Sequence, residues 1–224
     1  MASDVSNHYR GARGEAYFAQ QNLSGDLGGK LKARLFPLVK KSDAVLDFGC
    51  GGGWLLKNLE AQTRIGVDPN AAAREQCLRN GIEAYASISD VPSEYVFDCA
   101  LSNHALEHVA DPIAALKALR SRLKPGGRVY IVVPIDDWRV QRRVDLRKRD
   151  RHLHTWTPLL LGNTLDEAGF EDISVEVMTT AWPPRFEFFH RVLPSPLFDA
   201  LCWVSSAVLK RRQLRAMAAN PPTG

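Results

Sequence analysis

The sequence predicts an α/β fold, in which a doubly wound and mostly parallel sheet carries helices on both faces. Three observations support this prediction. The apolar run 44–46 is typical of a buried parallel strand, and it ends at the carboxylate of Asp47. A glycine-rich turn and a helix-compatible apolar stretch, 54–59, follow it directly. A second short strand, 65–67, ends in another acid, Asp68.

The glycine turn indicates which ligand the first strand would hold. Gly49, Gly51 and Gly53 alternate along the chain, and glycine lets the backbone turn sharply and approach a ligand closely. The dinucleotide fingerprint G-x-G-x-x-G would need a third glycine at position 54, which is Trp54. Asp47 is a poor neighbour for a pyrophosphate but a good one for a cation, such as the ammonium or sulfonium of S-adenosylmethionine (SAM). An NAD-dependent enzyme is therefore disfavoured.

The second acid, Asp68, lies 19 residues after Gly49, where a carboxylate can accept hydrogen bonds from both hydroxyls of a ribose. With this acid and the turn, the chain resembles the class I SAM-dependent methyltransferase family, of the type that acts on small biosynthetic molecules. The resemblance spans about residues 40–180 and implies a Rossmann-like, seven-stranded sheet with SAM as cofactor. The stretches that carry it are 45–53, 66–70, 97–112 and 123–134.

The resemblance also implies a set of cofactor-binding residues. The glycine turn would hold the methionine end of SAM, and Asp68 would hold the ribose. Ser87 stands where the family often has an acid that contacts the adenine, and Ile88 could pack on the ring. Residues 102–104 should face the methyl group, because the first and fourth strands end at the topological switch point. The expected set is Asp47, Gly49, Cys50, Gly51, Asp68, Pro69, Ser87, Ile88, Ser102 and Asn103.

Local signals predict the remaining elements. Asn80 and Gly81 end a helix, and Thr157 has the character of an N-cap, with Pro158 at the first helical position. Alternating apolar residues predict further strands, although the alanines of the last one also permit a helix. The predicted helices are 71–80, 113–123, 158–168 and 196–210, and the predicted strands are 82–86, 96–102, 129–133, 170–178 and 213–219.

We expect a single domain with four parts. In the family, the segment before the sheet forms a lid over the cofactor. Tyr9, Tyr17 and Phe18 would either wall the site or pack this segment onto the core. The segment after the fifth strand would cover the acceptor. The parts are 1–40 (helical lid), 41–180 (SAM-binding core, with the cover at about 135–157), 181–211 (helical insertion) and 212–224 (final strand and tail).

The composition is that of a globular chain. Its 224 residues carry a formal net charge of +4, which does not by itself imply nucleic acid as a partner. The N-terminus lacks a signal-peptide pattern, and the apolar stretch 197–209 is too short to span a bilayer. No C-x-x-C spacing occurs, which argues against a zinc site or disulfide framework and for a reducing cytoplasm. The four cysteines are Cys50, Cys77, Cys99 and Cys202.

Histidines are the candidate catalytic residues. Methyl transfer from SAM requires alignment of the reactants and, for a hydroxyl acceptor, removal of a proton. His104 is the first candidate because it follows the fourth strand, and His108 lies one helical turn further along. His152 and His154 lie in the expected cover. His104, Glu107 and His108 could also share a helix face and bind a metal, but capping and packing explain them better, so no metal is expected.

Two segments bear on the acceptor and on membranes. The basic stretch 139–151 could recognise a phosphate or carboxylate on the acceptor, or form a solvated surface. The helix near 197–212 has an apolar face that by default packs on its own domain, but that could instead make a peripheral contact with an anionic membrane. The apolar residues of this face are Leu197, Leu201, Val204 and Val208.

The leading hypothesis is a cytoplasmic methyltransferase that transfers a methyl group from SAM to an oxygen or nitrogen of a small-molecule acceptor, which could be anionic. A first alternative is methylation of a sugar, glycan or lipid-linked precursor at the membrane surface. A second is a protein that binds SAM without catalysis, which the retained acids and glycines disfavour. Nucleic acid is not an expected acceptor, because 102–105 lacks the N/D-P-P-Y/F/W motif of enzymes that methylate base amines. The oligomeric state stays open.

Overall fold

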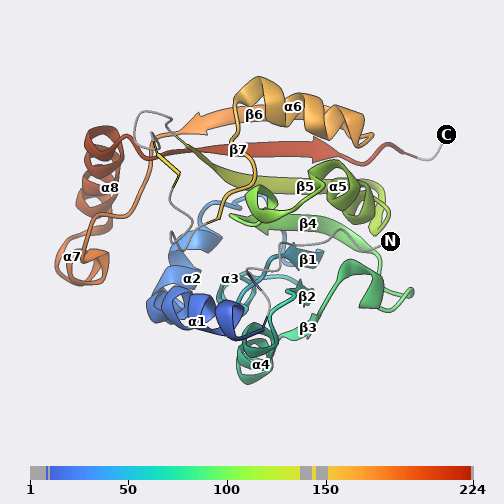
Figure 1. Ribbon diagram of the computed structural model, residues 1–224, viewed down its shortest axis with the longest axis horizontal. Helices are drawn as coiled ribbons and strands as arrows, with labels where there is room; N and C mark the ends of the chain where they lie inside the picture. Colours follow the sequence, from blue (N-terminus) through green and yellow to red (C-terminus); the bar gives the residue numbers. More distant parts are fainter. Residues whose placement is uncertain (1–8, 10, 137–142, 145–150, 223–224) are drawn as a thin grey trace.

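A computed structural model describes residues 9, 11–136, 143–144 and 151–222, and it contains one seven-stranded sheet (Figure 1). The strand order is β3-β2-β1-β4-β5-β7-β6. The first five strands pair in parallel, whereas β7 runs antiparallel to β5 and to β6. This topology confirms the predicted fold. The strands are β1 (Ala44–Phe48), β2 (Thr63–Val67), β3 (Glu83–Tyr85), β4 (Phe97–Asn103), β5 (Leu123–Ile135), β6 (Glu171–Met178) and β7 (Arg212–Ala219).

β1 can occupy the middle of the sheet because its side chains are apolar toward both faces. Val45 and Leu46 point to opposite faces and both are fully buried, as expected of a parallel strand that is covered on both sides. β2 pairs with one edge of β1, and β4 pairs with the other. The carboxyl ends of these three strands therefore meet at one edge of the sheet, where Asp47 and Asp68 lie.

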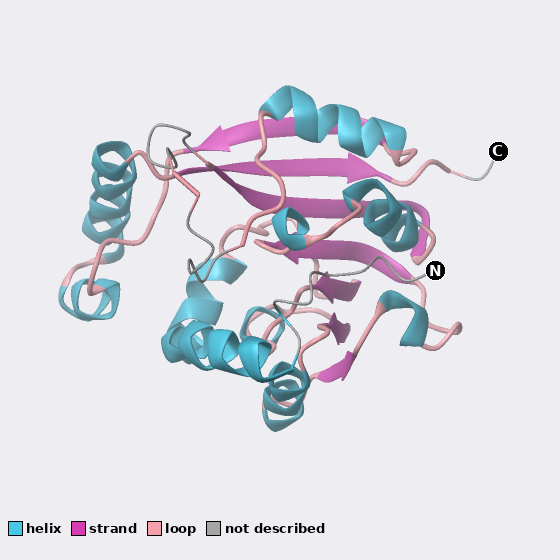
Figure 2. Ribbon diagram, in the orientation of Figure 1, coloured by secondary structure: helices cyan, strands magenta, loops and turns pink. Residues whose placement is uncertain are grey.

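Helices cover both faces of the sheet (Figure 2). Leu56 of α3 and Cys77 of α4 belong to one apolar core, on one face of the sheet. Leu116 of α5 and Leu161 of α6 belong to the other core. Near the chain start, α1 packs against α4, and α2 packs against α3. The helices are α1 (Gly11–Gln21), α2 (Gly25–Ala33), α3 (Trp54–Lys57), α4 (Ala71–Arg79), α5 (Pro112–Arg120), α6 (Pro158–Glu167), α7 (Phe186–Val192) and α8 (Ser195–Leu209).

Side-chain caps fix the starts of α4, α5 and α6. The Asn70 side chain accepts from the backbone N–H of Ala72 at 3.0 Å and so begins α4 immediately after the acid of β2. The Thr157 hydroxyl accepts from the N–H of Leu160 at 3.1 Å. This bond confirms Thr157 as the N-cap of α6.

The chain after β4 differs from the expectation in two places. His104 has a positive φ of 54°, which ends the regular backbone and leaves only a 3₁₀ turn, η4 (Leu106–His108), before α5. The expected helix face shared by His104, Glu107 and His108 therefore does not exist. In addition, α5 ends at Arg120, and β5 already begins at Leu123, where it pairs with Phe97.

The insertion before β7 forms α7 and α8, which lie together at one end of the molecule (left in Figure 1). The predicted helix is present, but the side that it buries is not the expected one. Phe198 and Cys202 are buried, in a cluster with Leu31 of α2, whereas Val204 and Val208 are exposed. No helix in the described part of the chain is long and apolar enough to cross a membrane.

Candidate functional site

A cavity of about 1250 Å³ lies at the carboxyl ends of the parallel strands. Asp47, Asp68 and Asn103 line it from the ends of β1, β2 and β4. The opposite wall comes from α1, α2 and the segment that joins α8 to β7. Ligand pockets typically have volumes of about 300–1000 Å³, so this cavity has room for a cofactor and a second molecule.

The glycine turn after β1 forms the floor of the cavity. Gly49 has φ 79°, and a Cβ on it would lie 2.3 Å from the Cβ of Ala105, so this position tolerates no side chain. Gly51 has φ 53°, and a Cβ there would meet no atom within 4 Å. Gly51 therefore leaves open space at the position where a ligand would approach the backbone.

Asp68 is held in place by the same turn. The backbone N–H of Gly51 donates to its Oδ2 and the N–H of Asn70 donates to its Oδ1, both at 2.9 Å. Burial raises the pKa of the Asp68 carboxyl, and these two hydrogen bonds oppose that rise. Each oxygen keeps a further lone pair for a ligand, which suits two hydroxyl donors.

Asp47 is buried, and its Oδ1 has no hydrogen-bond partner among the described residues. Burial raises the pKa of this carboxyl to about 7, although Lys32, which lines the same cavity, lowers it. A buried carboxylate without a hydrogen bond is unfavourable until a donor or a cation reaches it. The ammonium of SAM has the charge and the donors that this position lacks, so the residues present fit the cofactor.

Ser87 and Ile88 line the cavity next to β3. The Ser87 hydroxyl donates to the carboxylate of Asp90 at 2.8 Å, and Ile88 is 8% exposed. Asp90 itself does not line the cavity, so its carboxylate acts there only through the Ser87 hydroxyl. The position of Asp90, three residues after Ser87, carries no family motif, so only the structure identifies it.

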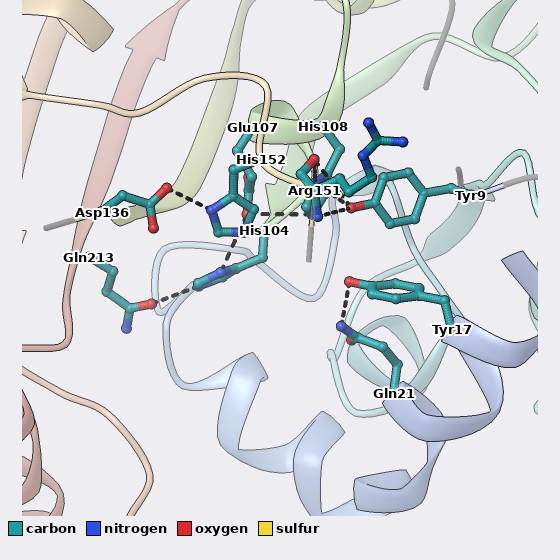
Figure 3. A network of polar contacts seen from close by, with 10 residues as sticks. All are labelled: Tyr9, Tyr17, Gln21, His104, Glu107, His108, Asp136, Arg151, His152 and Gln213. Atoms are coloured by element: carbon teal, nitrogen blue, oxygen red, sulfur yellow. Dashed lines mark hydrogen bonds and ion pairs between the residues drawn. The ribbon is translucent and has the colours of Figure 1, made fainter. Parts of the chain in front are cut away.

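His104 lies between two acceptor groups at the edge of the cavity (Figure 3). Its Nδ1 is 3.6 Å from Oε1 of Glu107, a carboxylate that is fully buried. Its Nε2 is 2.9 Å from Oε1 of Gln213 in β7. The Gln213 Nε2 donates to the carbonyl of Thr180 at 3.4 Å, which orients the amide oxygen toward His104. Gln213 comes from a distant part of the chain, so no sequence signal pointed to it.

His108 and His152 lie on the other side of Glu107. The Nδ1 of His108 is 2.7 Å from the hydroxyl of Tyr9, and the Nδ1 of His152 is 2.7 Å from Oδ2 of Asp136. Glu107, His108 and His152 each offer one ligand atom, and these atoms lie within 4.8 Å of one another, a spacing that could hold a metal ion. The sequence had suggested His104, Glu107 and His108 as a possible metal set. In the structure, His152 takes the place of His104 in this set.

Several expected residues lie elsewhere. Ser102 is fully buried within β4 and does not line the cavity, because neighbouring side chains of a strand point to opposite faces. His154 also lies outside the cavity lining, and its Nε2 is 2.8 Å from the carbonyl of Val109. Cys50 lines the cavity, but the Cys77 thiol and burial raise the pKa of its thiol, which makes it a poor nucleophile. Most of the basic stretch 139–151 lies outside the described residues.

A family model described as "Methyltransferase domain" matches residues 18–175, which is most of the chain. The chain belongs to this methyltransferase family. It is 38% identical over 112 residues to a ubiquinone biosynthesis O-methyltransferase from Xanthomonas axonopodis pv. citri (strain 306). The aligned stretch covers 45% of the chain and 46% of the relative. The chain therefore matches less than half the length of this relative. It is 25% identical to Arginine-hydroxylase NDUFAF5, mitochondrial, from Rattus norvegicus, over 88% of the chain and 62% of the relative.

Solved structures of methyltransferases share the fold. A possible histamine N-methyltransferase from Thermotoga maritima has a TM-score of 0.60 at 21% identity and covers 92% of this chain and 93% of its own. A phosphoethanolamine N-methyltransferase 2 from Haemonchus contortus, solved with S-adenosylhomocysteine, has a TM-score of 0.57 at 20% identity, over 90% and 53% of the two chains. These structures share the fold of this chain, and the match over residues 18–175 places the chain in the methyltransferase family.

Proposed function

We propose that this methyltransferase transfers the methyl group of SAM to a hydroxyl of a small biosynthetic intermediate, with His104 as the general base. The observation that carries the proposal is the pair of His104 and the buried Glu107, 3.6 Å apart at the edge of the cavity. A hydroxyl acceptor must lose a proton during the transfer, whereas an amine mainly needs to be neutral. A histidine backed by a buried carboxylate therefore favours the hydroxyl.

The arrangement follows the logic of other histidine bases. Glu107 would hold the Nδ1–H of His104 and stabilise the imidazolium that forms. In the free protein Nε2 donates to Oε1 of Gln213, so a neutral Nε2 that takes the proton of the acceptor requires the acceptor hydroxyl to replace this amide oxygen. Long contacts of this kind in a free enzyme shorten when the substrates bind. Bound SAM supplies the activated methyl group and its own leaving group. The position of the Gln213 Oε1, 2.9 Å from Nε2, marks where an acceptor oxygen would come.

The cofactor would occupy the floor of the cavity. Asp47 and the glycine turn would hold the methionine end, Asp68 the ribose, and Ser87 with Ile88 the adenine. The segment 1–40 would act as the lid. This role is supported by three of its aromatic residues, Tyr9 and the α1 residues Tyr17 and Phe18, which all line the cavity. The ring of Tyr9 also packs against that of His108 at 4.5 Å, so the lid reaches the proposed catalytic edge.

A labelling experiment tests the proposal. The purified protein is incubated with methyl-labelled SAM and a cell extract that has been separated into small-molecule, lipid and macromolecular fractions. We expect label in the small-molecule fraction, on an oxygen, and loss of transfer with His104→Gln. His190→Gln is the matched control, because His190 packs on Phe198 in the α7–α8 region and does not line the cavity. Label confined to protein or RNA, or on nitrogen, would contradict the assignment.

A second candidate acceptor is an amphiphilic or lipid-linked precursor. It is favoured by the cavity wall, to which α8 contributes the apolar Trp203 and Leu209, next to the basic Lys210 and Arg211. Label in the lipid fraction would support this acceptor. The same assay with a chelator, followed by added Zn²⁺ or Fe²⁺, tests whether Glu107, His108 and His152 use a metal, because two imidazoles and a carboxylate suit such ions. Dependence on the added ion would transfer the role of His104 to it.

A further inference from the structure

Helix α8 carries apolar residues on two sides, about 120° apart around its axis. One side, with Phe198 and Cys202, is buried against α2 and the start of the insertion. On the other side, Leu197, Val204 and Val208 follow the spacing i, i+7, i+11, which places them on one face, and they are 57%, 48% and 73% exposed. A helix that is apolar all round is normally buried on every side. The outer side of α8 therefore has the composition of a surface that something covers.

Neighbouring residues extend this surface. Phe188 and Val192 of α7 are each 51% exposed, and α7 packs against α8. Of the 16 exposed large apolar residues in the described chain, seven fall within residues 186–209, while the others are scattered over separate elements. We call these seven the α7–α8 face; they are Phe188, Val192, Leu197, Trp203, Val204, Val208 and Leu209. Clustered exposure of this kind marks an interaction site.

Basic residues lie at the ends of the two helices that form the α7–α8 face. Arg185 lies at the start of α7 and Arg191 near its end, and a run of three exposed basic residues, 210–212, follows α8 directly. The acids in the same segment are Glu187, which is exposed, and Asp199, which is paired with Arg34 through two contacts of 2.9 and 2.6 Å. The charge of this region is therefore positive on balance, which complements an anionic partner.

We propose that the α7–α8 face docks on a lipid bilayer that contains anionic lipids, with α8 lying in the plane of the interface. Its apolar outer side would enter the headgroup boundary, and the flanking arginines and lysine would contact lipid phosphates. Trp203 at the flank of α8 suits this position, because tryptophan prefers the membrane–water interface. A second copy of the chain fits less well, since a symmetric contact would bring two sets of basic residues together.

Docking would also place the cavity at the bilayer. Trp203, Leu209 and the basic run 210–212 line the cavity as well as belonging to, or flanking, the α7–α8 face. An amphiphilic acceptor could then pass from the bilayer to His104 without full exposure to water. This step rests on the proposed function, whereas the docking itself does not.

Sedimentation with vesicles tests the docking independently of methyl transfer. The full chain is mixed with vesicles of phosphatidylcholine alone, or of equal parts phosphatidylcholine and phosphatidylglycerol. We expect sedimentation with the anionic vesicles, weakening as salt is added, and at least about a tenfold loss of binding in the double variant Val204→Glu/Val208→Glu. The matched control is Leu78→Glu on α4, where the leucine is 68% exposed and lies outside the α7–α8 face.

Folding of each variant is checked by SAM binding in a calorimeter, so that loss of vesicle binding is not confused with unfolding. Failure of the wild-type chain to bind anionic vesicles while it binds SAM would overturn the proposal. Equal vesicle binding by the wild type and the double variant would also overturn it. A dimer in sedimentation velocity that the double variant dissociates would assign the α7–α8 face to self-association instead. Vesicle binding without methyl transfer would leave the docking supported and contradict only the proposed function.

Discussion

The proposed cofactor side and the proposed acceptor side of the cavity are built in different ways. On the cofactor side, Asp47, Gly51 and Asp68 come from two adjacent parallel strands and the turn between them, within 22 residues of sequence. On the acceptor side, Gln213 and Glu107 meet around His104 although 106 residues separate them. The proposed cofactor contacts thus depend on one local motif, whereas the proposed acceptor contacts depend on segments that are remote in the sequence.

The largest expected effect lies on the acceptor side. His104→Gln should lower kcat by about 100-fold or more, because a positioned base contributes about 10²–10⁴-fold. The affinity for SAM should not change, since the cofactor residues are untouched. Stopped assays with the labelled acceptor fraction give kcat, and calorimetry gives the SAM affinity. If kcat is retained, His104 is not the base; if SAM binding is lost too, the two sides of the cavity are not separable.

The reciprocal variant on the cofactor side is Asp68→Ala. It should weaken SAM binding by an order of magnitude or more, because it removes the acceptor for the ribose and also the acceptor for the N–H groups of Gly51 and Asn70. Calorimetry measures the change, with Glu75→Ala on the exposed side of α4 as the control. An unchanged dissociation constant would exclude Asp68 from the cofactor site.

The affinity for SAM should also depend on pH through Asp47. Below pH 7 this carboxyl is mostly protonated, because burial raises its pKa to about 7, and a neutral carboxyl attracts the ammonium of SAM weakly. Affinity should therefore rise by up to about tenfold per pH unit between pH 5.5 and 7. In Asp47→Asn the rise should disappear. A pH dependence that persists in this variant would assign it to another group.

The smallest expected effect concerns the stability of the free protein. Burial raises the pKa of Asp47 from the usual 3.8 to about 7 in the folded protein. The free energy of unfolding therefore falls as the pH rises from 3.8 to about 7, because the buried carboxyl becomes ionised, and above pH 7 the loss is complete. Asp47→Asn removes this loss. The variant should melt higher than the wild type at pH 8, by roughly 2–4 °C for each kcal/mol, and about equally at pH 4. A lower melting temperature at pH 8 would show that the carboxylate already has a stabilising partner without SAM.

The contrast between local and remote contacts explains which site residues can be predicted from the sequence. The positions of Asp47 and Asp68 follow from strand ends and a glycine turn, and parallel pairing brings such ends together without further information. Gln213 contacts His104 only because β7 pairs with β5, the strand next to β4. Tyr9 contacts His108 only because it lies against the 3₁₀ turn that follows β4. The positive φ of His104 also carries no signal, since a histidine at that position fits a helix pattern equally well.

Helix α8 shows a further limit. Apolar residues also occur outside the face predicted for it, Phe198 and Cys202 among them, so periodicity predicts the helix but not which side is buried. The structure buries the side of Phe198 and exposes that of Val204, the reverse of the default expectation. Similarly, Ser102 and His154 have the residue types of a site, but strand alternation and a carbonyl contact place their side chains away from the cavity.

The hydrogen bond between Gln213 and Thr180 has a consequence for regulation. These two residues flank the insertion 181–211, and the 3.4 Å contact between them closes it at its base. The same amide group that closes the base also faces His104. If α7 and α8 shifted, this side chain would carry the shift to the ring of the proposed base. The turnover rate would then depend on what the insertion touches, and the proposed lipid surface would change kcat even for an acceptor that dissolves freely in water.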